Sequence, residues 1–166
     1  RRIRHGKYIE NVLDSICAYE PEQVDIDLGN KMRNQFESLE NGKLIETIKA
    51  MSFDERKEYF EKTLLPMICN MMDVNAGFLG WFEDERTAGF YNEQEKGIAM
   101  NMLFLTSNDD EVLCVMVNTI IHECKHARQW DAVSGRNSHG YSDALIAQWK
   151  DNFEDYIQPE ESDEGY

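Results

Sequence analysis

Apolar side chains recur every three or four residues through the first part of the chain, the spacing that places them on one face of a helix. This pattern predicts a helix over residues 8–16, which Pro21 closes. It predicts a second helical stretch over 32–39, an interruption at 41–42, where the sequence reads Asn-Gly, and a resumption over 44–48.

Ser52 followed three residues later by Glu55 is a capping box, a pair of side chains that satisfy backbone donors at the start of a helix. The apolar side of this helix runs from Phe53 to Met72. We expect Pro66 to kink it, because proline has no backbone N–H to donate. Stripes of methionine and aromatic residues at helical spacing are typical of a packed interior, so the helical part, residues 1–73, is assigned no chemistry.

The pattern changes from residue 74 onward. Glycines separate short aromatic or aliphatic runs over residues 78–82, 87–91 and 97–105. Short runs bounded by glycine are typical of strands joined by turns. These runs predict a small antiparallel or mixed sheet.

Two further helices are predicted after the sheet. Polar residues at 108–110 offer N-cap oxygens and first-turn negative charge to a long helix over about 110–131. A loop rich in glycine and polar residues follows over 135–140. A last helix starts at Ser142 and Asp143, and we expect Pro159 to end it.

The fold class that these elements predict is α+β. The N-terminal helices would pack on a compact second part, residues 74–166, within a single domain of 166 residues. A chain of this length buries a hydrophobic core without disulfides or partners, and its 42% hydrophobic and 30% charged residues are typical of a globular protein.

The charge balance limits the classes of partner that the protein is expected to bind. With 17 basic and 32 acidic side chains the formal net charge is −15, so a phosphate backbone would be repelled and we expect no nucleic-acid partner. No apolar run is long enough to cross a bilayer, and we expect no membrane partner. The sequence leaves the oligomeric state open.

The sequence gives little guidance on where in the cell the protein is located. The chain begins without Met and carries no signal-peptide-like stretch, so it looks trimmed and its targeting information is expected to be missing. Its four cysteines, at positions 17, 69, 114 and 124, lie in apolar contexts without C-x-x-C spacing. We expect them to be buried and reduced, which slightly favours the cytoplasm.

Segment 122–126 carries the candidate chemistry, because it reads His-Glu-Cys-Lys-His, an H-E-x-x-H motif. At 3.6 residues per turn, His122 and His126 lie about 40° apart around the helix axis, so both imidazoles reach one metal ion. Glu123 lies about 60° beyond His126, where its carboxylate touches a metal-bound water without binding the metal. This geometry is typical of a zinc hydrolase.

A chance occurrence of H-E-x-x-H is rare at this composition, because only about 0.01 such matches are expected in a chain with this content of His and Glu. An apolar stripe on the opposite side of the helix predicts that it packs from behind while the histidines face a site. The competing interpretation is two surface histidines at helical spacing. A di-iron site would need a second E-x-x-H, but His5 and His139 follow Arg2 and Arg136 at that spacing.

The motif, the preceding run at 97–104 and the segment 118–129 together resemble the zincin metallopeptidases. The metzincin branch has Gly and His three and six residues after the second motif histidine, where this chain has Gln129 and Ala132. The chain therefore resembles the gluzincin branch more closely. This resemblance implies zinc bound by His122 and His126, Glu123 as the general base, and hydrolysis of a peptide or protein substrate.

In gluzincins a downstream glutamate supplies the third protein ligand, and here the resemblance leaves several candidates. Glu160, Glu161 and Glu164 follow Pro159, and a residue beyond Tyr166 is a further candidate. The last of these would leave the 166-residue chain a weak zinc binder.

Further expectations concern the substrate and the neighbouring side chains. We expect residues 97–105 to form a strand with an open edge that pairs with an extended peptide. His139, near Tyr141, either stabilises an oxyanion or is an exposed loop residue. Asn118 and Thr119 precede the motif on the metal-facing side of the helix and are candidates to orient the histidines. The alternative to an enzyme is a zincin-like binding or regulatory module that does not turn peptides over.

Overall fold

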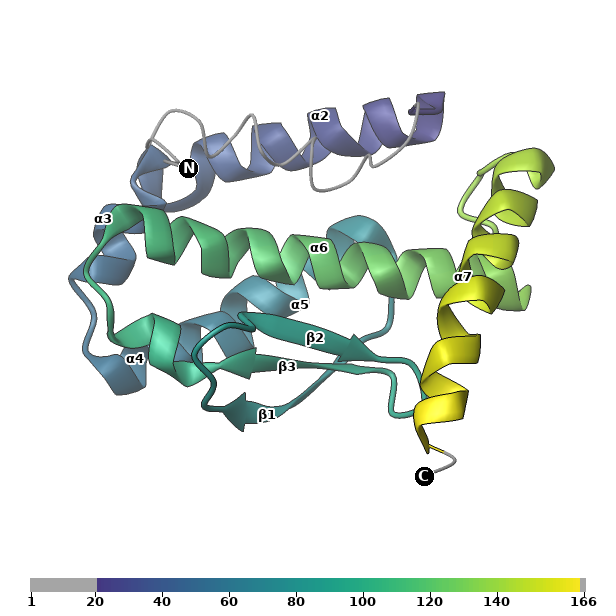
Figure 1. The fold of residues 1–166 in the computed structure, drawn as a ribbon. Helices are drawn as coiled ribbons and strands as arrows, with labels where there is room; N and C mark the ends of the chain where they lie inside the picture. The colour runs from purple at the N-terminus through teal and green to yellow at the C-terminus, as the bar shows by residue number, and fades with distance from the viewer. Residues whose placement is uncertain (1–20, 165–166) are drawn as a thin grey trace.

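The computed structural model describes residues 21–164, with side chains to residue 153, and it is an α+β structure of helices around a small sheet (Figure 1). The predicted fold class is therefore confirmed. The helix expected over 8–16 and Cys17 lie outside the described residues.

The predicted break in the second helical stretch is confirmed. Helix α2 (Gln23–Ser38) is followed by the 3₁₀ turn η2 (Leu39–Gly42) and helix α3 (Leu44–Lys49). Glu40 and Asn41 adopt positive φ angles of 52° and 58°, which reverse the chain direction between the two helices. Asparagine tolerates this conformation better than most residues, as the Asn-Gly signal implied.

Helix α4 (Phe53–Tyr59) begins with the predicted capping box, in which Glu55 N donates to Ser52 Oγ and Ser52 N to Glu55 Oε1. The π-helical turn η3 (Phe60–Leu64) and helix α5 (Leu65–Met72) continue it. In the π-turn the N–H of Leu65 bonds the carbonyl of Phe60. The discontinuity expected from Pro66 is thus a widened turn just before it, with the proline in the first turn of α5.

The sheet is mixed and has the order β1-β3-β2. Strand β1 (Gly77–Phe82) pairs parallel with β3 (Gly97–Asn101), and β2 (Gly89–Asn92) pairs antiparallel with β3. The expected open edge on residues 97–105 is therefore wrong, because β3 is the central strand and every residue in it is buried. The edge strands are β1 and β2.

Strand β3 ends at Asn101, where the 3₁₀ helix η4 (Met102–Thr106) begins. The Asn101 side chain explains the ending, because its Oδ1 accepts from Leu103 N. Its Nδ2 donates to the carbonyl oxygens of Asp84 and Thr87 and so fixes the connection between β1 and β2. That connection carries β2 to the far side of β3 instead of forming a hairpin with β1.

Helix α6 (Asp110–Ser134) confirms the long helix predicted over 110–131 and extends it by three residues. The Asp109 side chain caps it by accepting from Glu111 N, and Gly135 ends it with a φ of 83°. Helix α7 (Asp143–Glu164) begins as predicted after Ser142, whose Oγ accepts from Leu145 N. The expected stop at Pro159 is wrong, because the helix loses one backbone donor there but continues to Glu164.

One buried cluster joins the helical first part to the sheet and α6. It includes apolar side chains of α2, α3, α5, β3 and the back of α6. The predicted apolar stripe on α6 is confirmed, since all six of its residues are buried: Leu113, Met116, Val117, Ile120, Cys124 and Ala127. The part of the chain that the structure describes contains no helix long and apolar enough to cross a membrane.

The three cysteines among the described residues are buried, as predicted. Cys69 on α5 and Cys124 on α6 lie with their Sγ atoms 3.7 Å apart. Because Cys124 belongs to the H-E-x-x-H segment, this contact packs the back of the motif against α5.

Candidate metal centre

Helix α6 brings the two motif histidines together at their Nε2 atoms, which lie 3.0 Å apart, with the rings at 90° to each other. Two nitrogens that each lie about 2.0 to 2.1 Å from a tetrahedral zinc ion are about 3.3 Å apart. The histidine pair is thus close to the spacing that a zinc ion requires. The structure therefore brings the two ring nitrogens within reach of one ion, and their binding of a metal stays a prediction.

Glu123 lies beside the pair, with Oε2 3.9 Å from His122 Nε2. Its other oxygen, Oε1, accepts a hydrogen bond of 3.0 Å from the backbone N–H of Tyr91 in β2. One ligand atom from each of His122, Glu123 and His126 lies within 4.8 Å of the others, close enough to surround an ion. Glu123 is therefore oriented toward the predicted metal position by the sheet as well as by its own helix.

Partial removal from water shifts the pKa of all three side chains. Desolvation lowers the pKa of His122 and, together with the neighbouring His122 ring, lowers the pKa of His126 to about 4. Desolvation raises the pKa of Glu123 to about 7, against the opposing effect of the Tyr91 N–H. Both imidazoles are thus neutral, the form that binds metals, and the carboxyl exchanges protons near neutral pH.

A glycine in β2 explains why α6 comes so close to the sheet. A Cβ atom at Gly89 would lie 2.9 Å from both the carbonyl oxygen of Ala99 and Cγ2 of Thr119. No other residue type fits this approach without a shift. Gly89 and Tyr91 lie two residues apart on β2, so the same close approach places the Tyr91 N–H near Glu123.

The hydrogen-bond pattern of the sheet shows that β2 has an outer edge at this site. Asn101 N donates to Ala88 O, and Phe90 pairs with Ala99 two residues further along β2. Backbone groups alternate in direction along a strand, so those of Gly89 and Tyr91 point away from β3. Sequence reasoning missed Tyr91, because no local pattern shows which strand reaches the motif.

The polar residues preceding the motif do not bond the histidines. Thr119 Oγ1 donates to the carbonyl of Val115, one turn back in its own helix. Asn118 Oδ1 is buried and has no hydrogen-bond partner among the described residues. After the motif, Gln129 shares a side-chain hydrogen bond with His126. This bond raises the pKa of His126, opposite to the effect of burial.

His139 and Tyr141 have hydrogen-bond partners other than the two motif histidines, and Tyr141 Oη accepts from Lys125 Nζ of the motif segment over 3.0 Å. His139 is buried, so the exposed-loop expectation is wrong. Its Nε2 lies 3.0 Å from Asp131 Oδ2 and its Nδ1 lies 3.3 Å from Arg128 Nη1. Tyr141 Oη donates to Asp25 Oδ1 over 2.6 Å. Because both ring nitrogens of His139 face partners, the arrangement gives no support to an oxyanion role.

The third ligand stays a prediction. Glu160, Glu161 and Glu164 belong to the last turns of α7, beyond the described side chains. Among side chains that are described, the group able to hold an ion consists of His122, Glu123 and His126 alone.

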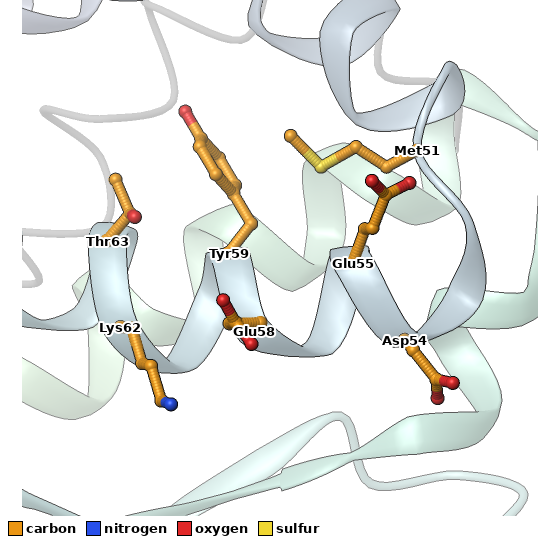
Figure 2. Close-up of a pocket in the computed structure, with 7 residues that line it drawn as sticks. All are labelled: Met51, Asp54, Glu55, Glu58, Tyr59, Lys62 and Thr63. Carbon is orange, nitrogen blue, oxygen red and sulfur yellow. The ribbon is translucent and has the colours of Figure 1, made fainter.

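A separate pocket of about 370 Å³ lies along α4 (Figure 2). The side chains that line it are Met51, Asp54, Glu55, Glu58, Tyr59, Lys62 and Thr63. No motif residue belongs to this lining. Glu55 serves the capping box and Tyr59 Oη donates to Glu40 Oε2 over 2.8 Å, so two of its polar groups have structural partners.

None of the family models, curated proteins or solved structures compared with the chain matches it. The functional argument therefore depends on the residues of the site itself.

Proposed function

We propose that the protein is a zinc-dependent metallopeptidase of the zincin type. The observation that carries this proposal is the pair of Nε2 atoms 3.0 Å apart, flanked by a Glu123 carboxylate that a strand N–H holds in place. If the two histidines were ordinary surface residues, nothing would explain why a largely buried carboxyl group lies beside them. Neutral imidazoles are the form that binds a metal, and a carboxyl group with its pKa raised to about 7 suits a residue that accepts a proton and then donates it.

The residues present fit a zinc ion, because two neutral imidazole nitrogens are preferred zinc ligands. His122 and His126 would hold the ion, with a third ligand from the end of α7 or beyond. Zinc in such a site supplies Lewis acidity, which activates water and polarises a carbonyl group.

Glu123 is the general base of the proposed reaction. Its carboxylate takes a proton from the attacking water and passes it to the nitrogen of the leaving amine, so one side chain serves both halves of the hydrolysis. The Tyr91 N–H bonds Oε1 and leaves Oε2, on the His122 side, as the proton acceptor. Tyr91 is thus a positioning residue that acts through its backbone.

The proposed substrate is an extended peptide that pairs with the outer edge of β2. This edge replaces the edge of residues 97–105 that the sequence analysis expected, because β3 is central. The backbone groups of Gly89 and the carbonyl of Tyr91 point toward such a peptide and would bond it as an added strand. The His122 side chain, 55% exposed, leaves the site open to solvent beside this edge.

The substitution Glu123→Gln in the full natural chain tests the proposal. We expect the variant to retain zinc and to hydrolyse peptides about 10²- to 10⁴-fold more slowly, because the amide cannot accept the proton. Glu111→Gln, in the first turn of the same helix, is the matched control and should keep full activity. Undiminished turnover in Glu123→Gln would overturn the assigned base.

A zincin-like binding or regulatory module is the second candidate. The observation that favours it is the described ligand set, which supplies two nitrogens and no third protein ligand. Zinc binding with peptide binding but no hydrolysis in the natural chain would support this module and exclude the peptidase.

A further inference from the structure

The outer face of the sheet, on the side away from α6, carries an apolar surface formed by Leu79, Phe82 and Phe90. The rings of Phe82 and Phe90 lie with their centroids 5.5 Å apart. Leu79 and Phe90 are 38% and 43% exposed, among the most exposed large apolar side chains described. Leu79 lies over Gly97, where a Cβ atom would lie 2.5 Å from its Cδ2.

Phe90 belongs to the edge strand that reaches the candidate site. Its neighbours Gly89 and Tyr91 face α6 or the core below the sheet, since Gly89 contacts Thr119. Side chains alternate between the two faces of a strand, so the Phe90 ring lies on the opposite, outer face. The ring is thus one residue from the N–H that holds Glu123.

A peptide added to the edge of β2 would place one side chain directly opposite Phe90. Cross-strand neighbours on the same face lie with their Cβ atoms about 4.5 to 5.5 Å apart. On the inner face the helix leaves little room, because α6 already approaches Gly89 within a contact distance. The outer face is open, and its nearest side chain is the exposed Phe90 ring supported by Phe82.

We propose that Phe90, supported by Phe82, is a specificity-determining residue that selects peptides with an aromatic or large aliphatic side chain opposite it. The selected residue lies next to the one opposite Tyr91, whose N–H bonds the proposed general base Glu123. An apolar side chain covers the exposed ring, whereas serine covers less of it and aspartate loses hydration beside it. This inference rests on the proposed function, since it assumes that a peptide occupies the β2 edge.

Three fluorescein-labelled decapeptides test the inference. Their flanks alternate Thr and Lys, and they differ only in one central residue, which is Phe, Ser or Asp. Each peptide slides along an edge strand, so its central residue reaches the position opposite Phe90 in one register. Dissociation constants are measured by fluorescence anisotropy with zinc-loaded full chain carrying Glu123→Gln, which prevents turnover.

We expect the Phe peptide to bind about fivefold more tightly than the Ser peptide, the range of an aromatic cross-strand pair. Adding Phe90→Ser should abolish this difference, and Phe90→Leu should retain most of it. Phe53→Ser is the matched control, because Phe53 is 36% exposed on α4 and lies outside the site. Thermal melts of each variant confirm that it is folded.

Equal affinities for the three peptides, no binding of any of them, or a preference that survives Phe90→Ser would each overturn the inference. Hydrolysis by the unsubstituted chain is measured separately. A Phe preference without hydrolysis contradicts only the peptidase proposal, and hydrolysis without a Phe preference contradicts only the role of Phe90.

Discussion

Two polar regions share helix α6, and their groups are satisfied in different ways. In the buried charge cluster, formed by Asp25, Lys125, Arg128 and Tyr141, Lys125 Nζ lies 3.0 Å from Asp25 Oδ1 and Arg128 Nε donates to Tyr141 Oη over 3.1 Å. All four side chains are at least nine-tenths buried. This cluster ties α2 and α6 to the loop that precedes α7.

The candidate metal centre belongs to the same stretch of helix, where its residues alternate with Lys125 and Arg128, and it contains two neutral imidazoles and a carboxyl group. Its two Nε2 atoms face each other, and among the described residues the hydrogen bond that fixes it from another element is the one from Tyr91 N–H to Glu123. In the buried charge cluster Lys125 faces the Asp25 carboxylate and Arg128 donates to the Tyr141 hydroxyl, whereas the metal centre offers two neutral imidazole nitrogens to a cation. The paired charges stabilise the fold, and the imidazole nitrogens are the groups available to bind a metal ion.

The largest effect is expected from Asp25→Ala, which removes the carboxylate from the buried charge cluster. We expect a loss of about 3–5 kcal/mol in the free energy of unfolding, because the substitution removes the carboxylate that faces the buried charge of Lys125. Urea denaturation followed by circular dichroism measures the loss. A change as small as that of a surface substitution would show that the cluster does not hold the helices together.

A smaller effect is expected from Gly89→Ala, which alters the approach of β2 to α6 without touching a metal ligand. The added Cβ meets Ala99 O and Thr119 Cγ2 at 2.9 Å, so we expect a loss of about 1–3 kcal/mol and a weaker Tyr91 to Glu123 bond. Hydrogen exchange of the Tyr91 amide should become faster.

Gly135→Ala is the control for this prediction. Gly135 has a φ of 83° and no atom within 4 Å of a built Cβ, so its substitution strains only the backbone. It should lower stability without changing the exchange rate of the Tyr91 amide. The same acceleration in both variants would contradict the role of Gly89 in placing that amide.

The smallest effect on the zinc-free protein is expected from His122→Ala. His122 is 55% exposed, and we expect the free energy of unfolding to change by less than about 0.5 kcal/mol. With zinc at 100 times its dissociation constant, the unsubstituted protein gains about 2.7 kcal/mol and the variant gains none. Thermal melts with and without zinc separate the two cases. An equal zinc-induced shift in both proteins would contradict the assigned ligand.

Local patterns predicted the helices because their signals lie within a few residues. The Ser52 and Glu55 capping box, the break at 41–42 and the apolar back of α6 all appear in the structure as expected. The spacing of His122 and His126 is also local, since one helical turn alone brings the two rings together.

Long-range pairings could not be predicted from the same patterns. The position of β3 between β1 and β2 depends on the Asn101 side chain, which fixes the connection between the outer strands. The Tyr91 to Glu123 bond and the Asp25 to Lys125 pair join residues 32 and 100 positions apart. No periodicity within one element specifies such contacts, because they depend on how finished elements pack.

The most direct test of the central claim compares His126 of the metal centre with His139, whose ring contacts Arg128 of the buried charge cluster. His126→Gln removes a proposed zinc ligand, and His139→Gln removes a buried histidine paired with Asp131 next to Arg128. Zinc affinity of each zinc-free protein is measured by competition with a chelating dye, and stability by urea denaturation.

We predict that His126→Gln weakens zinc binding by at least about 100-fold and leaves the zinc-free fold intact, because it removes a metal ligand. His139→Gln should keep the zinc affinity of the unsubstituted protein and lose about 1–3 kcal/mol of stability, because Asp131 and Arg128 lose a partner. Unchanged zinc affinity in His126→Gln would contradict the account, since the pair of Nε2 atoms on α6 would then not be the metal centre.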